Sequence, residues 1–224
     1  MGMPASLDPV GDHDEFARCY SRHSRAYLAS QRWTAERVRR ELLDELHPVP
    51  RYEFIDGALI VTASPNPWHA RAVAVLLELL APYVRRHALG WALTSPSDVE
   101  VAPDSIAQPD VFVVPAATVA RLERRTTPQP FTALSFAAEV LSPSSVRHDR
   151  FRKRRFYARV GVPDSWVIDL ETRVIERSVP EADAVTLHDE RIAWHPAGAP
   201  EPFVLDVAAY FADVLGADDA LDAS

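Results

Sequence analysis

The chain has 224 residues, enough for one domain with short appendages. Its residues are 47% hydrophobic and 25% charged, as in an ordinary globular protein, and no apolar run approaches the roughly 18 to 20 residues that a membrane span needs. A net charge of −8 argues against a protein that coats nucleic acid by bulk electrostatics, although it permits an enzyme that contacts nucleic acid through a local site.

The two ends of the chain differ in composition from its middle. Residues 1–28 are polar, with prolines and acids, so we expect a weakly ordered N-terminal segment without a secretory signal. Residues 29–215 are expected to form a single domain, and residues 216–224 a loose acidic tail. Cys19 is the only cysteine, which excludes an internal disulfide and favours a cytoplasmic location.

The first predicted elements are a helix, a β-hairpin and a second, longer helix, over residues 34–46, 52–61 and 68–89. Thr34 is a candidate N-cap for the first helix, whose apolar residues repeat at helical spacing. Asp56-Gly57 separates two short apolar strands and favours a tight hairpin turn. The long helix carries an apolar stripe, which predicts that it packs against the core and stops near Gly90.

The rest of the chain predicts a mixed β-sheet flanked by helices. Strands are expected at residues 91–101, 110–114, 134–141, 165–170, 174–178 and 192–194, and helices at residues 147–160 and 203–214. The second and third of these strands are nearly continuous apolar runs, as in central strands that are covered on both faces. The predicted fold class is therefore α/β.

Two acids interrupt these apolar strands. Asp110 precedes a Val-Phe-Val-Val run, and Glu139 lies inside the next strand. A buried acid is costly unless it is paired or binds a cation, and two acids on neighbouring strands repel each other. Hard cations such as Mg²⁺ bind one or two carboxylates together with water and substrate phosphate, an arrangement suited to phosphodiester hydrolysis. The alternative is that both acids are solvated or paired with arginines at strand ends.

Of the 24 lysine and arginine residues, only Lys153 is a lysine. On the helix predicted over residues 147–160, it shares one face with Asp149 and Tyr157, because residues four apart align. Apolar neighbours of this row predict that the face turns to the sheet, which would point Lys153 toward Glu139. An amine near a reacting phosphate stabilises developing charge or orients the attacking water. The alternative is a solvated, arginine-rich helix in which the lysine is incidental.

A series of short motifs extends from Tyr52 to Asp169: Tyr52-Glu53, Ile55-Asp56-Gly57, Ser64-Pro65, His69, Pro109-Asp110, Glu139-Val140-Leu141-Ser142-Pro143-Ser144, Asp149, Lys153, Tyr157, Gly161-Val162 and Trp166. In order and spacing, the series resembles the Uma-two family of bacterial domains. That family belongs to the restriction-endonuclease-like PD-(D/E)XK nuclease superfamily. The resemblance therefore implies a restriction-endonuclease-like core.

The resemblance also implies residue roles. Asp110 and Glu139 correspond to the metal-binding acids, and Lys153 corresponds to the motif lysine. In the standard superfamily pattern this lysine follows the second acid by two residues, where this chain has Leu141. In the family the amine comes from the following helix instead. Glu53 matches an acid that could complete the metal site from the hairpin.

His69 matches a histidine that is frequent at the start of the family's first core helix. There it could bind phosphate or shuttle a proton. The alternative is a polar residue at a helix N-terminus that packs beside Trp68. The residues predicted to bind substrate are His69, Arg150 and Arg154.

Three functions are compatible with these features. The first is an endonuclease that hydrolyses DNA with Mg²⁺ or Mn²⁺, using Glu53, Asp110 and Glu139 as ligands and Lys153 as the electrostatic catalyst. We expect such an enzyme to form a homodimer, because restriction-type nucleases commonly pair two active sites. The second is a nuclease-like scaffold that binds nucleic acid or a protein without turnover. The third is an RNA or nucleotide phosphodiesterase that uses the same metal site.

Overall fold

The computed structural model describes residues 32–38, 51–62, 66–124, 129–141, 147–180, 182 and 184–216, with no side chains described at residues 51, 61, 62 and 147–150. Contacts divide the chain into Met1–Trp33 and Thr34–Ser224, and every element below belongs to the second unit. The predicted N-terminal segment over residues 1–28, nearly all of the acidic tail and the side chain of Arg150 lie outside the described residues.

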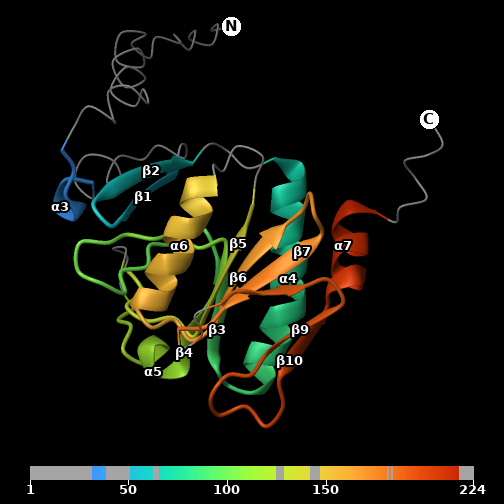
Figure 1. The fold of residues 1–224 in the computed structure, drawn as a ribbon. Coiled ribbons are helices and arrows are strands. Elements are labelled where there is room, and N and C mark those ends of the chain that lie inside the picture. The colour runs from blue at the N-terminus through green and yellow to red at the C-terminus, as the bar shows by residue number, and fades with distance from the viewer. Residues whose placement is uncertain are drawn as a thin grey trace, which may run out of the picture. The chain divides into compact units, whose positions relative to one another are not determined.

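A six-stranded mixed sheet forms the centre of this unit, in the order β3-β4-β5-β6-β7-β8 (Figure 1). Its strands are β3 (Gly90–Thr94), β4 (Val111–Pro115), β5 (Phe136–Val140), β6 (Ser165–Asp169), β7 (Val174–Ser178) and β8 (Thr186–His188). β5 and β6 pair in parallel, whereas the other neighbours pair antiparallel. The prediction of a mixed sheet is confirmed.

Helices cover both faces of this sheet (Figure 1). The covering helices are α4 (Pro67–Arg86), α6 (Arg147–Arg159) and α7 (Val207–Leu215). The short α5 (Ala116–Val119) contacts β3 and β4, and the short α3 (Ala35–Val38) contacts residues 51–55. α4 and α7 pack on one face, and α6 packs on the other. None of the helices that the structure describes combines the length and apolar character of a membrane span.

Two smaller antiparallel pairs accompany the central sheet: β1 (Arg51–Ile55) with β2 (Ala58–Thr62), and β9 (Arg191–Trp194) with β10 (Phe203–Asp206). The first pair is the predicted hairpin. Its turn residues Asp56 and Gly57 have φ angles of 52° and 74°, a left-handed conformation that this pair tolerates. Phe54 bridges to Ile106, which ties the hairpin to the chain segment that leads into β4.

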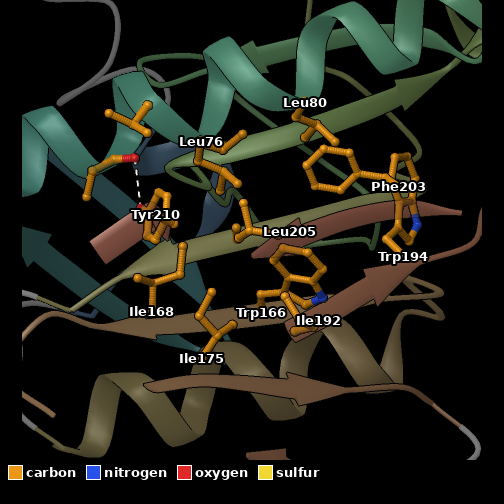
Figure 2. Packing of buried hydrophobic residues seen from close by; sticks show 14 of the residues in the cluster. Leu76, Leu80, Trp166, Ile168, Ile175, Ile192, Trp194, Phe203, Leu205 and Tyr210 are labelled. Carbon is orange, nitrogen blue, oxygen red and sulfur yellow. Dashed lines mark hydrogen bonds between the residues drawn. The ribbon is translucent and has the colours of Figure 1, made fainter. Parts of the chain in front are cut away.

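Apolar residues from both faces of the sheet form the core. Alternation along β4 assigns Val111 and Val113 to the face covered by α4 and α7, and Phe112 and Val114 to the face covered by α6. On the α4 face, Trp166 and Trp194 are fully buried beside residues of β9 and β10 (Figure 2). Because both faces are covered, each residue of β5 is buried, which raises the cost of placing an acid there.

Two predicted boundaries are wrong. The strand expected over residues 91–101 ends at Thr94, where its pairing with β4 stops at Val111. The closing helix expected over residues 203–214 begins only at Val207. Residues 203–206 form β10 against β9, and the Asp206 side chain caps α7 by accepting a hydrogen bond from the Ala209 N–H. The short α5 and β8 were not predicted.

Candidate active site

The two strand acids meet at one end of the central sheet. β4 starts where β5 ends, because the two strands are antiparallel, and their register pairs Val111 with Ala138. One further step along that register brings Asp110 opposite Glu139. Both residues are buried, with 4% and 7% of their surface exposed. The sheet topology therefore brings together two carboxylates that are 29 positions apart in the sequence.

Asp110 is held by donors from two elements. Its Oδ2 accepts a hydrogen bond from the backbone N–H of Val140 at 2.9 Å and lies 3.1 Å from Nε2 of His69. His69 is buried in the first turn of α4, where its own N–H donates to the side chain of Asn66 at 2.8 Å. The structure thus places His69 against an acid of the site.

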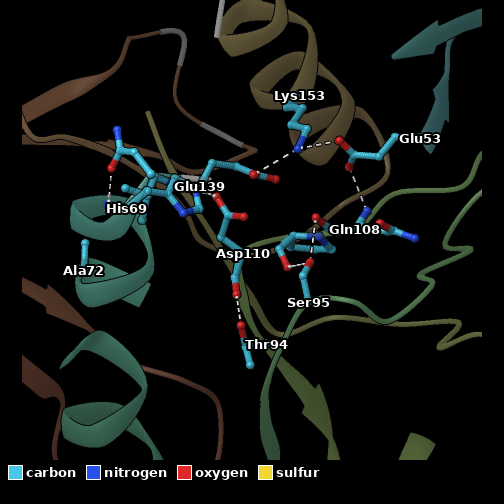
Figure 3. A network of polar contacts seen from close by, with 12 residues as sticks. Glu53, His69, Ala72, Thr94, Ser95, Gln108, Asp110, Glu139 and Lys153 are labelled. Carbon is cyan, nitrogen blue, oxygen red and sulfur yellow. Dashed lines mark hydrogen bonds and ion pairs between the residues drawn. The ribbon is translucent and has the colours of Figure 1, made fainter. Parts of the chain in front are cut away.

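Lys153 lies between the other two acids (Figure 3). Its Nζ is 2.8 Å from Oε2 of Glu53 and 3.0 Å from Oε2 of Glu139. Glu53 comes from β1 and is fully buried, and its Oε1 accepts the backbone N–H of Gln108 at 2.7 Å. Lys153 therefore points toward Glu139, as the helix periodicity predicts, and one ammonium group joins carboxylates from β1 and β5.

Tyr157 completes the contacts of Glu139. Its hydroxyl donates to Oε1 of Glu139 at 2.6 Å, and Lys153 donates to the Oε2 atom. The two donors are one helical turn apart on α6, so they reach the same carboxylate from one face of the helix. Tyr157 is buried in the core between α6 and the sheet. Each carboxylate oxygen of Glu139 thus has its own donor.

Burial and neighbouring acids set the electrostatics of Glu139. The pKa of Glu139 is raised to about 7, chiefly by burial. The charges of Asp110 and Glu53 also raise it, whereas Lys153 and the Tyr157 hydrogen bond lower it. Burial raises the pKa of Tyr157 well above its ordinary value, and the charges of Glu139, Glu53 and Asp110 raise it further, so the hydroxyl stays protonated as a donor. Glu53, Asp110 and Glu139 are thus three acids in one region, and Lys153 pairs with two of them.

The carboxylates of Asp110 and Glu139 fit a hard divalent cation that takes its remaining ligands from water. Among the described residues, no group of three His, Cys, Asp or Glu side chains converges to hold a metal ion. Mg²⁺ commonly takes one or two carboxylates and completes its coordination with water and substrate phosphate. Asp110 and Glu139 supply such a pair, and a cation beside them would relieve the repulsion that raises the pKa of Glu139.

The predicted site residues differ in where the structure places them. Glu53, Asp110, Glu139 and Lys153 share one region, and His69 joins them through Asp110. The guanidinium of Arg154 lies 5.0 Å from the ring centre of Phe151. The contacts of Tyr157 and Gln108 with the acids were missed. For Tyr157 the available signal was its spacing of four residues from Lys153.

Comparison with known proteins assigns the chain to a family. The family Uma2, described as "Putative restriction endonuclease", matches residues 39–208. The chain belongs to this family. Among solved structures, the crystal structure of "a putative nuclease belonging to DUF820" from Anabaena variabilis has a TM-score of 0.69 and 20% sequence identity, over 82% of this chain and 99% of that chain. No curated protein matches the chain.

Membership of Uma2 confirms the resemblance found in the sequence, and the structural similarity confirms the restriction-endonuclease-like fold. At 20% identity the similarity extends to the fold alone. The functional roles of Glu53, Asp110, Glu139 and Lys153 remain predictions, and the structure gives the contacts of each side chain.

Proposed function

We propose that this Uma2 protein is an endonuclease that hydrolyses DNA phosphodiester bonds with Mg²⁺ or Mn²⁺. The observation that carries the proposal is the position of Lys153, whose Nζ lies 3.0 Å from Glu139 at the end of the sheet where Asp110 faces the same acid. An acid pair that can hold a cation, with an amine beside it to stabilise developing charge, suits metal-assisted phosphodiester hydrolysis. The family's description agrees with this chemistry.

Asp110 and Glu139 hold the cation in this proposal. When bound, a divalent cation activates water for attack and neutralises charge on the phosphate. Asp110 is fixed for this role by the Val140 N–H and by His69. Glu139 is fixed by its two donors on α6. The carboxylates are therefore oriented by the protein before the substrate arrives, which limits the reorganisation that the reaction needs.

Lys153 supplies the positive charge beside the acid pair. Its amine stabilises the negative charge that develops on the phosphate or orients the attacking water. The geometry favours a supporting role for Glu53 rather than that of third ligand predicted from the sequence. Its Oε1 accepts the Gln108 N–H, and its Oε2 faces Lys153 at 2.8 Å. In Glu53→Gln we expect retained Mn²⁺ binding and reduced cleavage, whereas a metal-ligand role would weaken Mn²⁺ binding.

The proposed substrate contacts come from α6. Arg150 and Arg154 flank Lys153 along α6, so their guanidinium groups are proposed to bind DNA phosphates. His69 contacts Asp110, which favours a role in orienting this acid over the phosphate contact expected from the sequence. Local arginines would then offset the repulsion that the net charge of −8 exerts on DNA.

Plasmid cleavage tests this proposal. We expect the protein to nick or linearise supercoiled DNA with Mg²⁺ or Mn²⁺ and to lose this activity with a chelator. Lys153→Met and Glu139→Gln should each lose activity at least 100-fold, which corresponds to about 2.7 kcal/mol of transition-state stabilisation. Arg71→Gln is the matched control, because Arg71 forms an exposed ion pair with Asp213 on the surface of the α4 face.

Other outcomes identify the alternative functions. Folded protein that binds DNA but never cleaves it, with either metal, would contradict the nuclease and support the scaffold. Cleavage of RNA alone would support the phosphodiesterase that acts on RNA. The homodimer and the cytoplasmic location remain part of the proposal, and light scattering at tens of micromolar protein that returned the monomer mass would contradict the dimer.

A further inference from the structure

We infer that Tyr157 is a positioning residue: its hydroxyl fixes the carboxylate of Glu139 in the orientation that binds a divalent cation. This inference rests on the proposed function, in which Glu139 is a metal ligand. Tyr157 does not itself contact the substrate or the reacting atoms. It acts through Glu139, and the consequence that can be measured is therefore the affinity for the cation.

The contact geometry supports this role. The Tyr157 hydroxyl donates to Oε1 of Glu139 at 2.6 Å, and both residues are buried. Lys153 donates to Oε2, but its Nζ also lies 2.8 Å from Glu53, so Glu139 shares this donor with the hairpin. The tyrosine hydroxyl donates to the other oxygen and has Glu139 as its acceptor. Two donors on separate oxygens fix the rotation of the carboxylate plane, which one donor leaves free.

The position of Tyr157 on α6 explains why the hydroxyl is rigid. The ring packs in the buried cluster with Phe156 and Val162, and its neighbour Phe156 lies with its ring centre 5.5 Å away. The backbone of Tyr157 is also held, because the N–H of Val162 donates to the carbonyl oxygen of Tyr157 at 2.9 Å. A donor held this way is pre-organised. Partners of this kind commonly change metal affinity or activity by about 10- to 100-fold when they are removed.

Tyr210 offers a matched control elsewhere in the core. Its hydroxyl donates to the backbone carbonyl of Ala72 at 2.9 Å, and it is as deeply buried as Tyr157. Tyr157→Phe and Tyr210→Phe each remove one buried hydroxyl and one hydrogen bond. A purely structural role for Tyr157 would make the two variants behave alike toward a cation.

Calorimetric titration of the full chain with Mn²⁺ tests the inference. We expect Tyr157→Phe to raise the dissociation constant for Mn²⁺ about tenfold and Tyr210→Phe to change it less than twofold. Cleavage by Tyr157→Phe should recover in part when the Mn²⁺ concentration is raised in proportion. Equal Mn²⁺ affinity in the parent and in Tyr157→Phe would overturn the inference, although the proposed function would still stand.

Two further results separate the remaining cases. A parent protein that binds no Mn²⁺ would overturn the proposed function and this inference with it. If Tyr157→Phe does not melt cooperatively, Tyr157→Met replaces it, because a flexible methionine can occupy most of the site of the ring without offering a donor. Tyr157→Met should show the same loss of Mn²⁺ affinity, and unchanged affinity in a folded Tyr157→Met would contradict the inference.

Discussion

Glu139 shows at the scale of one residue how burial and function are coupled. It lies in a strand whose residues are all buried, and its two oxygens accept hydrogen bonds from Lys153 and Tyr157. Two donors do not balance the burial cost and the repulsion from Asp110, so the pKa of Glu139 rises to about 7. Either a proton or a cation can offset the remaining cost of burial and repulsion, and the two compete for the same carboxylate.

This competition predicts a pH dependence of metal binding. Below its pKa of about 7, Glu139 holds a proton that must leave before the cation binds. The affinity for Mn²⁺ should therefore fall about tenfold between pH 8 and pH 6, with release of up to one proton per ion. Calorimetric titration in buffers that differ in ionisation enthalpy measures both quantities. An affinity that stays constant over this range would show that Glu139 is already ionised at pH 6.

The same shift affects the metal-free protein with the opposite sign. The folded state holds the proton of Glu139 up to about pH 7, whereas the unfolded chain releases it near the ordinary pKa of 4.5. The contribution of Glu139 to the free energy of unfolding thus decreases as the pH rises through this window. Added metal should offset that decrease, because it binds only the folded state.

At the scale of elements, the connection from α4 to β3 contains backbone strain. Ala88 follows the C-terminus of α4 with a φ angle of 51°, a left-handed conformation that favours glycine. Two residues later, Gly90 has a φ angle of 132°, and a Cβ at this position would overlap with the carbonyl oxygen of Val114. Both positions therefore favour glycine, but the sequence has glycine only at residue 90.

Substitutions at these positions should change stability in opposite directions. Ala88→Gly should raise the free energy of unfolding by up to about 1 kcal/mol, because it removes left-handed strain. Gly90→Ala should lower it by about 3 kcal/mol, through the clash with β4 and the unfavourable φ angle. Urea denaturation measures both changes. A destabilised Ala88→Gly would show that the left-handed conformation at residue 88 carries no strain.

The predictable elements are those whose signals are local in the sequence. The Asp56-Gly57 turn, the apolar stripe of α4 and the apolar runs of β4 and β5 each identify their own element. β10 was predicted as helix, because Phe203–Asp206 becomes a strand only through its pairing with β9. The secondary structure of such segments depends on pairing with residues distant in sequence, and a local pattern carries no information about those residues.

The candidate site divides in the same way. Asp110 and Glu139 could be predicted because an acid in an apolar strand is anomalous at its own position, and Lys153 because its side-chain type is unique. The pairing of Asp110 with His69 depends on how the start of α4 meets the sheet. The hydrogen bond from Tyr157 depends on the depth at which α6 packs, which the spacing of residues does not fix.

At the scale of the whole molecule, the acid cluster couples metal binding to folding. Its members come from β1, the start of β4, β5 and α6, so the site exists only when hairpin, sheet and helix are assembled. A cation that binds this cluster binds the folded state alone. At about 100 times its dissociation constant it would add roughly 2.7 kcal/mol to the free energy of unfolding.

The choice of variants for this test follows from the contacts of the two acids. Asp110→Ala would leave the buried Val140 N–H without its acceptor and destabilise the protein whether or not metal binds. Asp110→Asn and Glu139→Gln remove the negative charge and retain an oxygen that accepts hydrogen bonds. Lys153→Met removes the amine and leaves both acids in place.

Thermal melting with and without Mg²⁺ or Mn²⁺ tests the central claim most directly. For a protein of this size, we expect the parent and Lys153→Met to melt about 5–10 °C higher with saturating metal. Asp110→Asn and Glu139→Gln should show no such shift. If neither ion changes the melting temperature of the parent at millimolar concentration, the acids of this site do not bind a divalent cation. The account of a metal-dependent nuclease is then wrong.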